Sequence, residues 1–398
     1  MLPLKIMLVP SPPFEEIGGV STHVRMLAGG LQELGHDVHV IAWLPPRPYR
    51  APFVTLPGLA LGTFSGYLSW RWVLAARHLY YLVEGLSATG FSPDVINVQN
   101  VMHISMAVRL KRLTGCQVVV TVHGFLADEA EEAGACARGD ALWTRLRNLE
   151  TRGFRHADQI IAVSSSTAAY VDEFAHAPLS VINNGIDTQM FSPSRAGSDL
   201  RGQAESDLRL LFAGALEPHK GVLDAVEVLV RLREAGISAE MAVAGDGSEI
   251  EPGRQVAEQG NVADHISWLG AVNKSDMPAF YRTGDVLLMP SKPRGSGGGE
   301  EPFPYTALEA MACGIPVIAY HTGGLPEQIK DGHTGVLVPA GDSRALTAAA
   351  LLFTDEALKR RMGLNARRHA EERFSALDMA TRFADVYKKA AMEAKGGR

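Results

Sequence analysis

The sequence predicts two tandem α/β domains of the Rossmann-like type, with parallel sheets that face a central cleft. Three observations support this fold class. The chain has 398 residues, and a chain of this length normally divides between two hydrophobic cores. Short apolar runs alternate with amphipathic segments, as in strand–helix–strand units. The alternation stops once, in a polar stretch, and then begins again, which indicates two domains.

The first domain is expected over residues 1–190. Its strand candidates are short apolar runs, each followed by a loop: residues 5–9, 37–42, 94–98, 117–122 and 159–163. The series ends in the sequence VINNGIDTQMF. Residues 191–207 are rich in Ser, Gly and charge without an apolar period, so we expect a linker there.

The second domain is expected over residues 208–375. Its strand candidates are residues 208–213, 239–244, 266–269, 286–289, 316–319 and 335–338. From Ala345 onward the chain is rich in Ala, Leu, Arg and Glu, which favours closing helices. Residues 376–398 are expected to form a C-terminal helix that packs back on the first domain.

Charge and cysteine content exclude two classes of protein. With 38 Lys and Arg against 44 Asp and Glu, the net charge is −6, so no nucleic acid partner is expected. Cys116, Cys136 and Cys313 form no CxxC pair and have no histidine cluster beside them, which argues against a zinc site. Unpaired cysteines favour a reducing compartment, and the first ten residues resemble a strand more than a signal peptide.

The longest apolar stretch, residues 67–86, is interrupted by Arg71, Arg77, His78 and Glu84, so we do not expect it to span a membrane. Its mixture of aromatic and basic residues suits a helix that lies on a membrane surface. A first-domain helix with a buried aromatic face explains the same pattern. The predicted location is the cytoplasm, with possible peripheral contact at the inner face of the membrane.

The segment EEPFPYTALEAMACGIPVIAY carries the strongest chemical signal. Glu301 and Glu309 bracket seven residues, and a helix is expected to begin near Tyr305 and Thr306. A helix that begins at the carboxyl end of a parallel strand presents backbone N–H groups and a partial positive charge, which suit a diphosphate. Two solvated surface glutamates are the alternative, but the small apolar residues around Glu309 favour burial.

With this motif, the chain resembles the retaining glycosyltransferases of family 4, also called glycosyl transferases group 1, which have the GT-B fold. Their motif of two glutamates separated by seven residues matches Glu301 and Glu309. The segments GGVSTHV, FAGALEPHKGV and GGLPEQIKDGHTGVLVP resemble further family segments in the family's order. The resemblance therefore spans nearly the whole chain, and it specifies the family but not the sugar.

The resemblance implies a role for each matching residue. Glu309 would hold the ribose hydroxyls, Glu301 would contact hydroxyls of the donor sugar, and Lys220 would bind the diphosphate. The residues implied in catalysis are Glu301, Lys220 and His123. The residues implied in binding the nucleotide sugar are Glu309, Gly18, Gly19, Tyr305, Thr306 and Val272. Taken alone, Lys220 is typical of a solvated helix start, the two glycines of a turn, and His123 of a structural strand end.

Two positions depart from the family pattern. An arginine usually follows the glycine of the second-domain loop, whereas Ala215 follows Gly214 here. Lys292 and Arg294 precede the glutamate motif, and we hypothesise that they replace this missing cation. Pro304 stands where the family more often has glycine, so one backbone donor is absent. The glycine-rich run before it suits either a flap that orders on binding or a tolerated surface insertion.

The resemblance also implies the reaction. The donor would be a UDP- or GDP-linked sugar, and the acceptor a glycan, a lipid-linked molecule or a small molecule, in the biosynthesis of a polysaccharide, glycolipid or glycoside. No pair of aspartates in a DxD pattern flanks the site, so no metal and no other cofactor is expected. The alternatives are a nucleotide-sugar epimerase and a non-catalytic nucleotide-sugar-binding protein. No GxGxxG follows a strand, which argues against a nicotinamide-dependent dehydrogenase.

Overall fold

The chain folds into two compact units. The computed structural model describes residues 3–10, 18–41, 92–132, 134–193, 206–293 and 301–396. One unit comprises Met1–Asn183 together with Leu377–Arg398, and the other comprises Asn184–Ala376. Each unit contains its own sheet and its own hydrophobic core.

The first unit contains a six-stranded parallel sheet in the order β2-β1-β3-β4-β5-β6. Its strands are β1 (Lys5–Val9), β2 (Asp37–Val40), β3 (Val95–Val98), β4 (Gln117–Val122), β5 (Gln159–Ala162) and β6 (Leu179–Val181). Apolar residues fill both faces, because successive side chains in a strand point to opposite sides. In β1, Met7 and Val9 belong to one core cluster, and Ile6 and Leu8 belong to the other.

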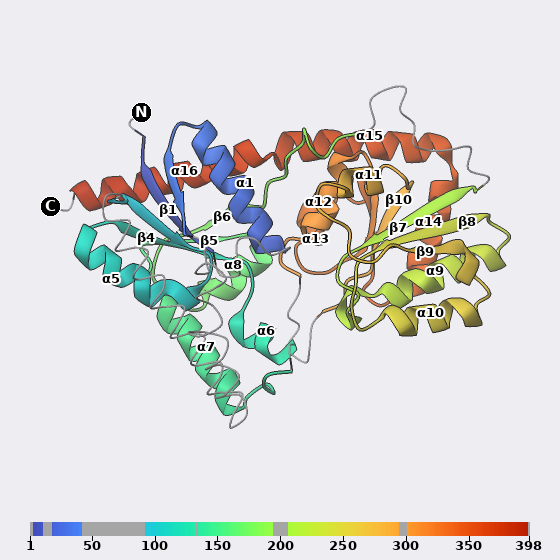
Figure 1. Cartoon of the computed structure of the whole chain (residues 1–398), viewed down its shortest axis with the longest axis horizontal. Helices are drawn as coiled ribbons and strands as arrows, with labels where there is room; N and C mark the ends of the chain where they lie inside the picture. The colour runs from blue at the N-terminus through green and yellow to red at the C-terminus, as the bar shows by residue number, and fades with distance from the viewer. Residues whose placement is uncertain are drawn as a thin grey trace, which may run out of the picture. The chain divides into compact units, whose positions relative to one another are not determined.

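Helices cover both faces of this sheet. They are α1 (Gly19–Glu33), η3 (Val101–His103), α5 (Ile104–Thr114), α6 (Leu126–Glu132), α7 (Ala141–Phe154), α8 (Ser165–Asp172) and α16 (Ala376–Gly396). α16 is the C-terminal helix, and it lies against β1 and α1 (Figure 1). Leu27 of α1 and Phe383 of α16 are buried in the same core cluster. The last helix therefore completes the core of the first unit.

One carboxyl group in this unit makes its stability depend on pH. Glu150 on α7 is 2% exposed and accepts the backbone N–H of Leu126 at the start of α6. Burial raises the pKa of Glu150 to about 8. The pKa of a glutamate in an unfolded chain is about 4.3. Between the unfolded and the folded pKa, the folded chain binds more protons than the unfolded chain, so the free energy of unfolding falls as the pH rises.

We therefore expect Glu150→Gln to remove this loss of stability. Glutamine keeps an acceptor for Leu126 and has no charge to bury. The variant should exceed the wild type by about 2 kcal/mol or more at about pH 8.5 and differ little at about pH 4, as measured by urea unfolding. Glu173→Gln, at an exposed position of the same unit, is the control and should leave the pH dependence unchanged. Equal pH slopes in the wild type and Glu150→Gln would contradict the prediction.

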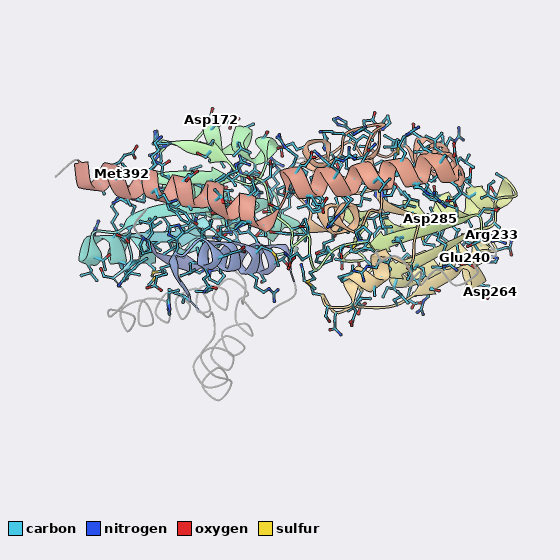
Figure 2. The ribbon with its side chains drawn as sticks, turned by 90° about the horizontal axis from the view of Figure 1, so that it is seen from above. Asp172, Arg233, Glu240, Asp264, Asp285 and Met392 are labelled. Carbon is cyan, nitrogen blue, oxygen red and sulfur yellow. The ribbon has the colours of Figure 1, made fainter. Side chains whose placement is uncertain are left out.

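The second unit contains a six-stranded parallel sheet in the order β12-β11-β10-β7-β8-β9. Its strands are β7 (Leu208–Ala213), β8 (Ala239–Ala244), β9 (Ile266–Trp268), β10 (Val286–Met289), β11 (Val317–Tyr320) and β12 (Gly335–Val338). Asp285 immediately precedes β10, Asp264 lies two residues before β9, and Glu240 is the second residue of β8. These labelled residues therefore mark the edge where strands begin (Figure 2).

The helices of this unit connect and cover its strands. They are η4 (Pro218–Lys220), α9 (Val222–Glu234), α10 (Ile250–Gln259), η5 (Ala263–His265), α11 (Met277–Tyr281), α12 (Tyr305–Ala312), α13 (Leu325–Gln328), α14 (Ser343–Leu351), η6 (Leu352–Thr354) and α15 (Glu356–Arg373). Apolar residues of α9 and α14 pack with β7 and β8 in one core cluster. This core holds the loops after β7 and β10 in place.

Candidate functional site

The candidate site lies where the strand order of the second sheet reverses. β7 and β10 are hydrogen-bonded neighbours, with β8 and β9 on one side and β11 and β12 on the other. In open parallel sheets, ligands bind outside the carboxyl ends of the strands at such a switch point. Lys220 ends η4, after β7, and Ser291 follows β10. Both residues therefore lie at the position that the topology favours for a ligand.

Lys220 and Glu301 form an ion pair at this edge. Lys220 Nζ contacts Glu301 Oε1, and Ser291 Oγ donates a hydrogen bond to Glu301 Oε2 at 3.0 Å. The side chains of Lys220 and Glu301 are 17% and 15% exposed. Partial burial strengthens their attraction relative to an exposed ion pair. The structure thus brings together two of the three residues predicted to act in catalysis.

Close backbone contacts hold this ion pair in place. A Cβ atom on Gly221, where φ is +73°, would lie 2.2 Å from the carbonyl oxygen of Pro290. A Cβ atom on Gly324 would lie 1.8 Å from the carbonyl oxygen of Pro302. The N–H of Gly324 also donates to the carbonyl oxygen of Glu301 at 3.0 Å. Glycine at these two positions lets the Lys220 loop approach the end of β10 and lets the Glu301 segment approach the start of α13.

Glu309 is a buried carboxylate with two fixed donors. It lies on α12 and is 7% exposed. Lys274 Nζ donates to Glu309 Oε1 at 3.0 Å, and the hydroxyl of Tyr281 donates to Oε2 at 2.9 Å. Burial raises the pKa of Tyr281 well above its ordinary value, so the hydroxyl keeps its proton. Glu309 therefore pairs with Lys274, whereas Glu301 pairs with Lys220.

The other predicted donor-binding residues of this unit are Tyr305, Thr306 and Val272. Tyr305 is the first residue of α12, and the Lys274 ammonium lies 5.4 Å from its ring centroid. Its hydroxyl is buried and has no hydrogen-bond partner among the residues that the structure describes. Thr306 is partly buried in the first turn of α12, and Val272 is partly buried in the loop after β9. These residues lie on the two segments that supply Glu309 and Lys274.

Lys292, one of the two residues hypothesised to replace the missing arginine, forms an ion pair with Asp224. Lys292 Nζ donates to Asp224 Oδ1 at 2.8 Å, and the hydroxyl of Tyr320 donates to Asp224 Oδ2 at 2.6 Å. Asp224 thus already compensates the charge of Lys292. Arg294 and the glycine run behind it lie outside the described residues. Replacement of the arginine at Ala215 by Lys292 or Arg294 stays a prediction.

The first unit holds the remaining predicted residues. Gly18 is the N-cap of α1, and Gly19 is the first residue of that helix. His123 follows β4, and its ring centroid lies 4.5 Å from that of His23 on α1. Burial, and then the neighbouring His23, lower the pKa of His123 well below its ordinary value, so its ring is neutral near pH 7. The structure brings His123 close to the start of α1.

A buried polar network lies next to His123. Its Nε2 atom is 2.8 Å from Gln99 Oε1. Gln99 also forms a hydrogen bond with Asn97, and Asn97 forms one with Thr121. Each of these three residues is at most 1% exposed. Buried polar side chains require such partners, because an unpaired one costs about 1–3 kcal/mol. The network fixes the ring of His123 at the carboxyl ends of β3 and β4.

Sequence reasoning did not identify Ser291, Tyr281 or Gln99. Ser291 and Gln99 each follow a buried strand, so the rule that ligands gather at strand ends could have selected them. Tyr281 carries no such signal, because an aromatic residue in an amphipathic segment is typical of a core position.

The described residues also bear on metal binding and on membranes. Among them, no group of three or more His, Cys, Asp or Glu residues has an arrangement that could hold a metal ion. Within the same residues, no helix has the length and apolar character needed to cross a membrane. Residues 67–86, the aromatic and basic stretch for which a membrane-surface helix and a helix with a buried aromatic face are the alternatives, lie outside the described part of the chain.

Comparison with known proteins places the two halves of the chain in two family models. The model described as "Glycosyl transferases group 1" matches residues 200–369. The model described as "Glycosyltransferase Family 4" matches residues 17–190. Together the two matches contain every predicted site residue.

Individual relatives agree with these matches. D-inositol 3-phosphate glycosyltransferase of Streptomyces bingchenggensis is 35% identical over 403 residues, which cover 95% of this chain and 86% of the relative. Glycogen synthase of Mycobacterium tuberculosis is 29% identical over 394 residues, which cover 93% of this chain and 91% of the relative.

Solved structures of other proteins share the fold. Sucrose-phosphate synthase of Thermosynechococcus elongatus superposes with a TM-score of 0.72 at 22% identity, over 96% of this chain and 98% of that one. Anabaena HepE in complex with UDP-glucose superposes with a TM-score of 0.70 at 20% identity, over 97% and 100% of the two chains. At this identity the likeness concerns the fold alone.

Proposed function

Because this chain belongs to the family 4 glycosyltransferases, the glycosyl transferases group 1 with the GT-B fold, we propose that it is a retaining, metal-independent hexosyltransferase. It would move a sugar from a nucleoside diphosphate carrier to an acceptor hydroxyl. The observation that carries this proposal is the partly buried contact between Lys220 and Glu301 at the switch point of the second sheet. An ammonium at this position can neutralise a leaving diphosphate.

The residues of the second unit divide the work on the donor. Breaking the bond between the sugar and the phosphate builds negative charge on the nucleoside diphosphate, and the fixed ammonium of Lys220 stabilises that charge without a metal. Glu301, oriented by Ser291, accepts hydrogen bonds from hydroxyls of the donor sugar. Glu309 accepts hydrogen bonds from the ribose hydroxyls. Catalysis then comes mainly from positioning and from stabilising the leaving group.

The anomeric configuration is retained if the acceptor attacks the anomeric carbon from the same side from which the leaving group departs. The acceptor oxygen bonds to the anomeric carbon as the bond to the phosphate oxygen breaks, and the departing phosphate takes the acceptor proton. This route needs no carboxylate nucleophile. We propose the first unit as the acceptor-binding unit, with His123, whose ring is neutral, among the catalytic residues and with Gly18 and Gly19 among those that bind the nucleotide sugar.

The donor is proposed to be a UDP- or GDP-linked sugar. HepE, which shares the fold, is known in complex with UDP-glucose. One relative is named as a GDP-mannose-dependent mannosyltransferase of Mycolicibacterium smegmatis. The acceptor is proposed to be a glycan, a lipid-linked molecule or a small molecule, in a polysaccharide, glycolipid or glycoside pathway. The proposed location is the cytoplasm, with peripheral contact at the inner face of the membrane when the acceptor is lipid-linked.

A donor screen tests this function. Thermal shift against UDP, GDP and ADP sugars should show one base that raises the melting temperature, because a ligand that binds only the folded state stabilises it. NMR of the product formed from that donor should show the same anomeric configuration as the donor. Turnover that EDTA abolishes and manganese restores would contradict the metal-independent mechanism. A new sugar isomer formed from donor alone would indicate the epimerase instead.

A further inference from the structure

Two side chains without an assigned role set the position of the Glu309 carboxylate. The hydroxyl of Tyr281 donates to Oε2 at 2.9 Å, and Lys274 Nζ donates to Oε1 at 3.0 Å. A carboxylate offers about four lone-pair sites, so one protein donor on each oxygen leaves further acceptor capacity on both. The two donors fix the plane of the carboxylate and still let both oxygens accept from a ligand.

Both donors are themselves held in place. Tyr281 is fully buried, and its ring packs against Phe280 and Phe191 at centroid distances of 5.4 and 6.3 Å. The ammonium of Lys274 lies 5.4 Å from the ring centroid of Tyr305 and 5.7 Å from that of Phe191. Aromatic faces attract a cation at such distances. A lysine side chain that is 25% exposed is thus kept near Glu309.

We infer that Tyr281 and Lys274 are positioning residues that orient Glu309 toward the adjacent 2′- and 3′-hydroxyls of a ribose. This orientation makes the donor site selective for ribonucleoside diphosphates over their deoxy counterparts. The inference rests on the proposed function, which assigns Glu309 to the ribose. A carboxylate whose plane is already fixed accepts from two adjacent hydroxyls without the entropic cost of ordering it on binding. A site built to pair with a hydroxyl rejects the analogue that lacks it, because a buried polar group then stays unpaired.

Tyr281→Phe tests the inference, because it removes one oxygen atom and keeps the ring. Calorimetric titration would compare UDP with 2′-deoxy-UDP and 3′-deoxy-UDP, and the GDP series would run in parallel. The wild type should bind the ribonucleotide about 10- to 100-fold more tightly than either deoxy form, as expected for hydrogen bonds to a charged group. Tyr281→Phe should reduce this preference at least about fivefold, by weakening ribonucleotide binding and leaving deoxynucleotide binding nearly unchanged. An unchanged preference would overturn the inference.

Tyr320→Phe is the matched control. Tyr320 is a buried tyrosine of the same unit, and its hydroxyl also donates to a carboxylate, that of Asp224 at 2.6 Å. A general loss of packing or charge balance changes binding of the ribo and deoxy forms together, so the preference should stay at the wild-type value in Tyr320→Phe. A preference that falls equally in Tyr320→Phe and Tyr281→Phe would count against a specific role for Tyr281.

Variants of Lys274 provide a second test of the inference. Lys274→Met keeps the apolar stem and removes the ammonium, so the preference for the ribonucleotide should fall, and Lys274→Arg should restore part of it. Failure of this inference differs from failure of the proposed function. If the wild type binds neither UDP nor GDP, the proposed function fails; if it binds one of them and Tyr281→Phe and Lys274→Met keep the wild-type preference, only the positioning role fails.

Discussion

Lys220→Met is expected to lower turnover with the preferred donor about 100- to 1,000-fold, the size of effect that removal of one fixed charge-stabilising donor produces. Methionine keeps most of the apolar stem of Lys220 and removes the ammonium that contacts Glu301. The lost charge acts on the leaving diphosphate, so turnover should fall more than the affinity for the donor. Steady-state kinetics at several donor concentrations measure the two quantities separately.

Two further variants define the cause of that loss. Glu301→Gln should cost much less in the Lys220→Met background than in the wild type, since residues in contact do not act additively. Lys111→Met is the matched control, because Lys111 also pairs with a partly buried carboxylate, that of Asp158 before β5. The pair of Lys111 and Asp158 lies at the edge of the first sheet where strands begin, away from the strand ends that carry the candidate site. Turnover in Lys220→Met equal to that in Lys111→Met would remove Lys220 from the mechanism.

The fold class could be predicted because parallel strands are buried on both faces and show as continuous apolar runs. β4 and β7 have the bounds that the apolar runs indicate, and the GT-B resemblance is confirmed by the fold and the family models. β6 was not predicted. It has three residues, all only partly buried, at the edge of its sheet, so hydrophobic burial leaves little pattern there.

The candidate site could be predicted in part, because its chemistry follows from strand ends and a helix start. α12 begins at Tyr305, as the sequence predicts, and Gly314, with φ of +78°, follows its end. The partners of the glutamates could not be predicted. Lys274 and Glu309 are 35 residues apart, and only the packing of α11 against α12 brings their segments together. The roles of these residues in the reaction stay predictions.

The largest effect on stability is expected at Arg367. This residue of α15 joins three backbone carbonyl groups: Nη1 donates to Phe191 and Ala312 at 2.7 Å each, and Nη2 donates to Thr188 at 2.9 Å. Ala312 is the last residue of α12, where carbonyl groups lack partners within the helix and a cation is favourable. The guanidinium therefore holds the end of the helix that carries Glu309.

Arg367→Met should lower the free energy of unfolding of the second unit by about 3–5 kcal/mol, because three carbonyl groups lose a charged donor at once. Amide hydrogen exchange along α12 and α15 measures this loss within the unit and does not require the whole chain to unfold in one step. Arg367→Lys should lie between the variant and the wild type, since an ammonium cannot span three carbonyl groups as a guanidinium does. Arg254→Met removes an exposed ion pair with Glu251 and should change stability by less than about 0.5 kcal/mol. If Arg367→Met fell within the range of Arg254→Met, the arginine would be a surface contact with no part in fixing α12.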